Sequence, residues 1–322
     1  MKEIKRKNHA SIIKKEIDLN NLVNYESLDL KLITHLLNEV ITENIFSTID
    51  LLKLLKDNYH ENITKTIKKL KDYSSVRFNC CYATIVLKNK LEKLGIDTKI
   101  ISYKSIGFSS PYGDDLIKEA HMAILIPTIR HNKICYIILD PGLRIPAPIE
   151  FFANSIKTVI EIDNDEIIIE KTKLAEYPYS IEIKGYNRYS TNDISYQCKE
   201  FFDTKYETIN PLDILFPIAY EILEGYRMIN YTLDNDTWAS IKIMVINQYL
   251  ECIDQKTRIK ISFSELKQME KSDLIKILVP FKYKLNTDVE ELVDIIFFTI
   301  EHSTEFLSMV INKNVVKEIK NR

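Results

Sequence analysis

The chain has 322 residues, of which 45% are hydrophobic and 28% are charged, a balance typical of folded globular proteins rather than disordered ones. Its 44 Lys and Arg residues face 46 Asp and Glu residues, so the net charge is −2, without the basic excess typical of nucleic-acid-binding proteins. No apolar run reaches the roughly 18 residues of a membrane span, and the five cysteines lack the regular spacing of a disulfide framework. We therefore expect a cytoplasmic protein that binds neither nucleic acid nor membrane.

Helices are predicted for the first 75 residues and again from Cys80 to Ile96. In the N-terminal segment, Ser27 is the expected N-cap of a helix whose apolar residues share one face. That face comprises Leu30, Ile33, Leu37, Val40 and Ile41. A second helix is expected over Leu51 to Leu55. The helix that begins at Cys80 has a nearly apolar face and Gly95 as its stop signal. This face continues through Thr84, Leu87, Leu91 and Leu94.

After this helix the pattern changes to short segments rich in Ile, Val and Tyr, with turn signals between them. The predicted strands are Lys99 to Tyr103, Ala120 to Pro127, Lys133 to Leu139, Thr158 to Ile162, Glu166 to Lys171 and Ser180 to Tyr186. Such a succession of hairpins predicts a mostly antiparallel sheet or a partial barrel. The glycines here are irregularly spaced, so neither a GxGxxG nor a Walker phosphate-binding loop can be drawn.

The last third of the chain is predicted to be helical. Asn210-Pro211 is a cap and first-turn pair, Asp236 is expected to open a helix that runs through Trp238 to Tyr249, and Thr287 to Glu290 matches a capping box. The predicted fold class is α+β, with N-terminal helices, an antiparallel sheet or partial barrel, and a helical C-terminal region. One boundary is expected, between residues 1–205, with the N-terminal helices and the sheet, and residues 206–322.

Three residues of complementary chemistry stand at the ends of predicted elements. Cys80 begins a helix, His121 lies at the start of a strand, and Asp140 follows the end of the next strand. A helix dipole and a neighbouring imidazole both stabilise a thiolate, which is the reactive form of cysteine. A carboxylate holds the imidazole in one tautomer, and a turn at 130–132 would place the two strands side by side. This order predicts a Cys80, His121, Asp140 triad, with backbone N–H groups at the helix start as oxyanion donors.

Cys81 is the alternative nucleophile. Helical steps from Cys81 lead to Ile85, Lys88 and Glu92, which form a poor core face, whereas the steps from Cys80 give the apolar face described above. The residue that shares the face packed against the sheet is expected to be the nucleophile, which favours Cys80.

A longer pattern runs from about residue 75 to residue 150. Its parts are Arg77, Cys80-Cys81-Tyr82, His121-Met122, Leu139-Asp140-Pro141-Gly142-Leu143 and Pro146-Ala147-Pro148. This pattern resembles the arylamine N-acetyltransferases and the wider transglutaminase-like group of papain-related folds. The resemblance implies a papain-like core and ping-pong transfer from acetyl-CoA, or another acyl thioester, to an amine.

The chain departs from the family pattern at three places. Phe78-Asn79 stands where the family's Arg-Gly-Gly-x-Cys loop has two glycines, and Gly142-Leu143-Arg144 stands where the family has Gly-Phe-Gly. Arg77 lies three residues before Cys80 where the family has four, and by that count Cys81 fits better.

Other functions stay open. The same residues fit a transglutaminase-like hydrolase or deamidase that acts on peptide or glutamine amides. The chain also fits an inactive scaffold whose helical C-terminal region binds a protein partner. No tightly bound cofactor is expected, and no Cys or His pair has the spacing of metal ligands.

Each residue of the triad also has a structural interpretation when it is taken alone. A free cysteine is often a buried packing residue, a histidine on an apolar strand is often a core residue, and Asp-Pro-Gly is often a turn. Their joint occurrence, in order and on the required elements, favours the triad. The isolated Cys135, Cys198 and Cys252 are expected to be packing residues, and His131 is expected to be solvated at a hairpin tip.

Overall fold

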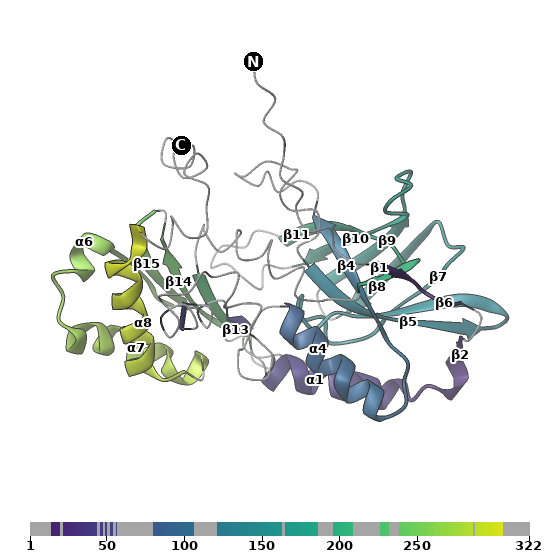
Figure 1. Ribbon diagram of the computed structural model, residues 1–322, viewed down its shortest axis with the longest axis horizontal. Coiled ribbons are helices and arrows are strands. Elements are labelled where there is room, and N and C mark those ends of the chain that lie inside the picture. Colours follow the sequence, from purple (N-terminus) through teal and green to yellow (C-terminus); the bar gives the residue numbers. More distant parts are fainter. Residues whose placement is uncertain are drawn as a thin grey trace, which may run out of the picture.

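The computed structural model describes residues 14–19, 22–43, 46–47, 49, 52–53, 56, 80–105, 121–162, 165–185, 196–208, 226–231, 238–245, 247–254, 256–285 and 287–304. Within these ranges the chain forms two large, mostly antiparallel sheets that lie at opposite ends of its longest axis, each accompanied by helices, and one small two-stranded sheet (Figure 1). No helix among these residues is long and apolar enough to cross a membrane.

The larger sheet, called the barrel-like sheet below, has the strand order β7-β6-β5-β4-β11-β10-β9-β8 in the described ranges, with β2 paired to β5. Its strands are β2 (Val23–Asn24), β4 (Lys99–Ser105), β5 (His121–Arg130), β6 (Lys133–Leu139), β7 (Ile149–Phe152), β8 (Lys157–Ile162), β9 (Asp165–Lys171), β10 (Tyr179–Gly185) and β11 (Tyr196–Phe202). All pairings along the path are antiparallel, and β2 runs parallel to β5. A small sheet of β1 (Lys14–Glu16) and β12 (Tyr206–Thr208) lies against β4.

Aromatic contacts show that this sheet is strongly curved. Phe151 on β7 contacts Phe202 on β11 and Tyr179 on β10, with ring centroids 6.1 and 5.3 Å apart, although β7 and β10 are five strands apart in the sheet order. Such contacts require the two halves of the sheet to face each other. The interior is therefore filled by side chains from alternate positions of each strand, as expected for a nearly closed barrel.

Two helices cover the outer face of this sheet, α1 (Leu30–Glu43) and α4 (Cys80–Lys93), which lie side by side (Figure 1). They bury one face each against outward residues of β5 and β6. From α4 these buried residues are Ala83, Leu87 and Leu91, and from α1 they are Ile33, Leu37, Val40 and Ile41. Burial of one Leu side chain contributes about 1.5–3 kcal/mol, so this face fixes the position of α4 on the sheet.

The second sheet has the order β16-β15-β14-β13-β3 among the described residues and is called the C-terminal sheet below. Its strands are β3 (Phe46–Ser47), β13 (Tyr226–Tyr231), β14 (Trp238–Met244), β15 (Tyr249–Asp254) and β16 (Arg258–Ser262). It packs against helices α6 (Phe263–Leu266), α7 (Lys271–Leu285) and α8 (Val289–Glu301) through one hydrophobic cluster. The same cluster includes Cys80, Ile100 and Met122.

The prediction of a helix that runs through Trp238 to Tyr249 is wrong, because Trp238–Met244 is strand β14 and Tyr249 begins strand β15. Apolar residues at Trp238, Ile241, Val245 and Tyr249 fit a helical spacing by coincidence. The buried set is Ala239, Ile241, Ile243 and Val245, which alternates with the two-residue period of a strand. The C-terminal region is therefore a mixed sheet and helix unit, not a helical one.

Several boundaries differ in detail from the predictions. The helix α1 begins at Leu30, and Asp29 caps it by accepting a hydrogen bond from the Leu32 N–H at 3.0 Å, whereas Ser27 lies in the preceding 3-10 turn. Asp288, not Thr287, is the N-cap of α8. Leu94 is 51% exposed and does not extend the buried face of α4. Gly95 ends this helix as predicted, with a φ of 78° that favours glycine.

The six predicted strands are confirmed within one to three residues at their ends, and β6 has the predicted bounds. Most of the helix expected at Leu51 to Leu55, the cap at Asn210-Pro211, and Asp236 itself lie outside the described residues. The boundary expected near residue 205 stays a prediction.

Candidate active site

The three predicted residues come from the ends of three elements that meet at one end of the barrel-like sheet. Cys80 is the first residue of α4, His121 is the first residue of β5, and Asp140 directly follows β6. The β5–β6 hairpin explains part of this arrangement. His131 and Asn132 turn the chain with φ values of 52° and 58°, so the start of β5 returns beside the end of β6.

Asp140 holds His121 through a short, buried contact. The Nε2 atom of His121 lies 2.9 Å from both carboxylate oxygens of Asp140. Since a carboxylate only accepts, Nε2 carries the hydrogen, and the other ring nitrogen, Nδ1, is left with a lone pair when the ring is neutral. The Leu143 N–H donates to the Oδ1 atom of Asp140 at 2.9 Å, which fixes the carboxylate in turn. Asp140 is fully buried and His121 is 8% exposed.

Cys80 lies on the same side of the imidazole as Gly142. A Cβ atom built on Gly142 would lie 2.4 Å from the Cβ of Cys80 and 2.7 Å from the Cε1 of His121. Both atoms lie close to this one point, so the Cys80 side chain is beside the imidazole, and the negative charge of Cys80 is among those that raise the pKa of His121. The structure therefore brings together Cys80, His121 and Asp140, in the order thiol, imidazole, carboxylate.

The charges around His121 favour its protonated form. Burial alone lowers the pKa of His121, but the negative charges of Asp140, Cys80 and Glu200, with the hydrogen bond to Asp140, hold this pKa well above its ordinary value of 6.5. An imidazolium beside the start of a helix is the environment that stabilises a thiolate. Burial raises the pKa of the two other described free cysteines, Cys135 and Cys252, the latter to about 12. A raised pKa disfavours the thiolate form of these two residues.

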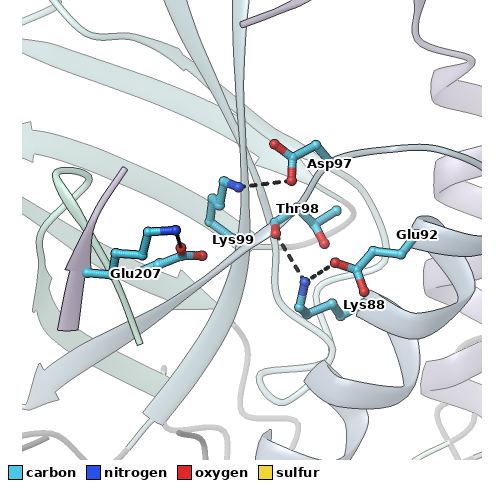
Figure 2. A network of polar contacts seen from close by, with 7 residues as sticks. Lys88, Glu92, Asp97, Thr98, Lys99 and Glu207 are labelled. Atoms are coloured by element: carbon cyan, nitrogen blue, oxygen red, sulfur yellow. Dashed lines mark hydrogen bonds and ion pairs between the residues drawn. The ribbon is translucent and has the colours of Figure 1, made fainter. Parts of the chain in front are cut away.

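Polar contacts along α4 hold this helix against the sheet, and sequence reasoning did not identify them. The Thr84 hydroxyl donates a buried hydrogen bond of 3.2 Å to the carbonyl oxygen of Met122. One turn further on, Lys88 is paired with Glu92 and donates to the carbonyl oxygen of Thr98 at 3.2 Å, as Figure 2 shows. The helix is thus joined to β5 near its start and to the segment before β4 near its middle. In the sequence, Thr84 is only a polar residue on the otherwise apolar face of this helix.

Two further residues face His121 from the barrel wall. The ring of Tyr103 on β4, the register partner of His121, lies 5.2 Å from the imidazole. Glu200 on β11 is 6% exposed and pairs in register with Ile181, whose side chain belongs to the interior cluster. In the sequence of β11, Glu200 shares the two-residue strand period of the apolar residues Cys198 and Phe202, and this acidic exception was the available signal for Glu200. It could not be used because the alternation of β11 was not assigned from the sequence.

The loop after Asp140 has an unusual backbone conformation at Arg144. This residue is buried and has a φ of 55°, in the left-handed region that glycine adopts most easily. It stands where the family motif has its second glycine. Main-chain hydrogen bonds close the loop: the Arg144 N–H donates to the carbonyl of Pro141, and the Ile145 N–H donates to that of Asp140, each at 3.2 Å.

The other residues named in the sequence analysis add nothing to the candidate site. Cys81 lies in α4, but its side chain, like Arg77 and Phe78-Asn79, is outside the described part of the chain, and so is the side chain of Cys198. His131 is exposed at the hairpin tip, as predicted. In the ranges that the structure describes, no group of three His, Cys, Asp or Glu side chains is arranged to hold a metal ion.

No protein-family model and no curated protein matches the sequence. Solved structures do match the fold. One is an arylamine N-acetyltransferase of Bacillus cereus with a unique Cys-His-Glu triad (14% identity, 79% of this chain and 90% of that chain, TM-score 0.46). Another is from Mycobacterium smegmatis (13% identity, 88% and 94%, TM-score 0.49). A third, from Mycobacterium marinum, is in complex with CoA (12% identity, 87% and 92%, TM-score 0.46). The solved structures that this chain resembles are thus arylamine N-acetyltransferases, and at TM-scores below 0.5 the likeness decides nothing about its reaction.

Proposed function

We propose that the protein is a thiol-dependent acyltransferase with Cys80 as nucleophile, His121 as base and acid, and Asp140 as the residue that orients the imidazole. One observation carries the proposal. The two carboxylate oxygens of Asp140 lie 2.9 Å from Nε2 of His121, which leaves Nδ1 to exchange a proton, and Cys80 lies beside the same imidazole. Cys81 is not supported in this way.

The first half-reaction transfers the acyl group to the enzyme. The Sγ atom of Cys80 attacks the carbonyl carbon of a thioester, its proton having passed to Nδ1 of His121. A new thioester forms on Cys80, the original C–S bond breaks, and the departing thiolate takes the proton from His121. Backbone N–H groups in the first turn of α4 are the proposed donors to the oxyanion.

The second half-reaction releases the acyl group to an amine. The amine nitrogen attacks the carbonyl carbon of the acyl-enzyme, His121 accepts a proton from that nitrogen, and the C–S bond to Cys80 breaks to regenerate the thiolate. The electrostatic environment of His121 suits this cycle. Asp140, Cys80 and Glu200 favour a charged imidazole, and a charged imidazole is the form that protonates a leaving group.

We propose acetyl-CoA or another acyl thioester as donor and an arylamine or hydrazine as acceptor, on the strength of the sequence pattern around Cys80, His121 and Asp140. A cytoplasmic location and a protein partner for the C-terminal region stay predictions. The C-terminal sheet and its helices α7 and α8 bury their apolar residues against one another, which gives no specific support to a partner.

Intact-protein mass spectrometry tests the proposal. Incubation with acetyl-CoA and no amine should add one acetyl group to the wild-type chain, peptide mapping should place it on Cys80, and an added arylamine or hydrazine should remove it. The matched control is Cys252→Ala, a buried thiol remote from the triad in sequence, which should be acetylated as the wild type is. Absence of acylation by any thioester, together with deamidation of glutamine peptides, would replace the transferase with the hydrolase.

A further inference from the structure

A side chain at Gly142 would collide with the candidate site. A Cβ atom at this position would lie 2.4 Å from the Cβ of Cys80, 2.8 Å from the Cα of Cys80 and 2.7 Å from the Cε1 of His121. The Cα and Cβ atoms of Cys80 are in or next to the main chain, and Cε1 belongs to an imidazole that Asp140 holds. The neighbours cannot accommodate a methyl group by a change of rotamer, so the main chain or the imidazole itself would have to move.

The imidazole has little freedom to move away. Asp140 holds its Nε2 atom at 2.9 Å, and the ring of Tyr103 lies 5.2 Å away. The main chain at Gly142 passes the ring near Cε1, since an added Cβ would lie 2.7 Å from that atom. His121 is thus bounded by a carboxylate, an aromatic ring and a bare stretch of main chain.

The segment that carries Gly142 is also fixed. The Leu143 N–H donates to Oδ1 of Asp140 at 2.9 Å, and the Ile145 N–H donates to the carbonyl oxygen of Asp140 at 3.2 Å. Retreat of Gly142 from Cys80 would therefore disturb the carboxylate that holds His121. The loop couples the orientation of the carboxylate to the spacing between thiol and imidazole.

We propose that Gly142 is a positioning residue, whose lack of a side chain lets the loop after Asp140 pass against Cys80 and His121 and set the distance between them. The proposal rests on the proposed function of this pair. It also explains why glycine is needed at a position where the backbone has no left-handed φ: the reason is a close approach, not a backbone conformation.

The test is Gly142→Ala, measured by the rate of alkylation of Cys80 with iodoacetamide as a function of pH, with the labelled peptide identified by mass spectrometry. In the wild type, alkylation should stay fast below the ordinary thiol titration near pH ~8.5. In Gly142→Ala, the half-maximal pH should move toward that ordinary value, because the added methyl group separates the imidazole from the thiol. Turnover should fall on the order of 10²-fold, as expected for a displacement of about 1 Å.

Gly95→Ala is the matched control. Gly95 has a φ of 78° and no atom within 4 Å of an added Cβ, so this variant strains the backbone without crowding a neighbour. It should lower the unfolding temperature and leave the pH profile of Cys80 alkylation unchanged. A role of Gly142 in stability alone would give the same result in both variants.

The outcomes separate the two proposals. A wild-type Cys80 with the profile of an ordinary thiol overturns the proposed function, and the positioning role fails with it. A reactive wild-type Cys80 with an unchanged profile in a folded Gly142→Ala variant overturns the positioning role alone.

If Gly142→Ala does not fold, the double variant Cys80→Gly/Gly142→Ala is measured, since it lacks the Cβ atom at 2.4 Å. Folding of the double variant supports the close contact. Equal loss of stability on Gly142→Ala in the wild-type and Cys80→Gly backgrounds overturns it, because the approach at 2.4 Å exists only in the first background.

Discussion

The hydroxyl of Thr84 and the carbonyl oxygen of Met122 are joined by a buried hydrogen bond of 3.2 Å, which attaches the Cys80 helix to the strand that begins with His121. Thr84 is one helical turn after Cys80, and Met122 is the residue after His121. A single contact therefore links the two elements that carry the proposed nucleophile and base.

Thr84→Val should weaken this link while keeping the shape of the side chain. Loss of one buried hydrogen bond lowers the free energy of unfolding by about 1 kcal/mol, and Cys80 alkylation should slow because α4 is held less firmly. The control is Thr42→Val in α1, where the hydroxyl is exposed and donates within its own helix at 2.8 Å. Chemical denaturation of both variants provides the measurement, and equal stabilities would show that the Thr84 bond contributes nothing.

Cys80→Ala should abolish acyl transfer and leave the protein folded, because a small residue replaces another at the start of a helix. Cys81→Ala should keep most of the activity. Turnover of an arylamine with acetyl-CoA is the measurement, and circular dichroism confirms folding. The reverse pattern would make Cys81 the nucleophile and the spacing from Arg77 the better guide.

Asp140→Asn should reduce turnover by something on the order of 10⁴, by analogy with loss of the orienting carboxylate in serine triads. The amide retains the shape of the side chain but can present its NH₂ group to Nε2, which then favours the wrong tautomer of His121. The unfolding temperature and the steady-state rate should be measured together. An unchanged rate in a folded protein would remove Asp140 from the mechanism.

The pKa of His121 should fall in Glu200→Gln, because one of the negative charges that raise it is removed. The high-pH limit of turnover should then move to lower pH, since the imidazolium is the acid that protonates the leaving group. Glu182→Gln is the control, because Glu182 alternates with the inward-facing Ile181 and Ile183 and so points to the other face of β10. NMR titration of the His121 ring reads the pKa directly, and equal titrations in the two variants would contradict the role of Glu200.

His121 should also make stability depend on pH. Its folded-state pKa is raised above 6.5, so its stabilising contribution is fully present below the unfolded-state value and is lost as pH rises through the folded value. The difference in free energy of unfolding between wild type and His121→Gln should therefore shrink above pH 6.5. Denaturation at a series of pH values tests this, and a difference that grows with pH would give the shift the opposite sign.

Local patterns allowed much of the barrel-like sheet to be predicted. The segments Lys133–Leu139 and Asp165–Lys171 are short, β-branched and bounded by turns, so their conformation follows from neighbouring residues alone. The helix α4 could also be predicted from local features, because its apolar residues recur with a period of 3.6 residues and Gly95 follows its end. Trp238–Met244 was misread because an apolar residue every three or four positions also fits a strand with bulky residues on both faces.

The sequence alone determined which residues we propose to carry the chemistry and in what order, because a thiol at a helix start, a histidine at a strand start and an aspartate after a strand are each local features. Only the tertiary structure decided what surrounds them. The approach of Gly142 to Cys80, the bond from Thr84 to Met122 and the placement of Glu200 near His121 join residues 62, 38 and 79 positions apart in the sequence. Contacts at such separations depend on how the sheet curves and how α4 packs on it, and no short stretch of sequence encodes either.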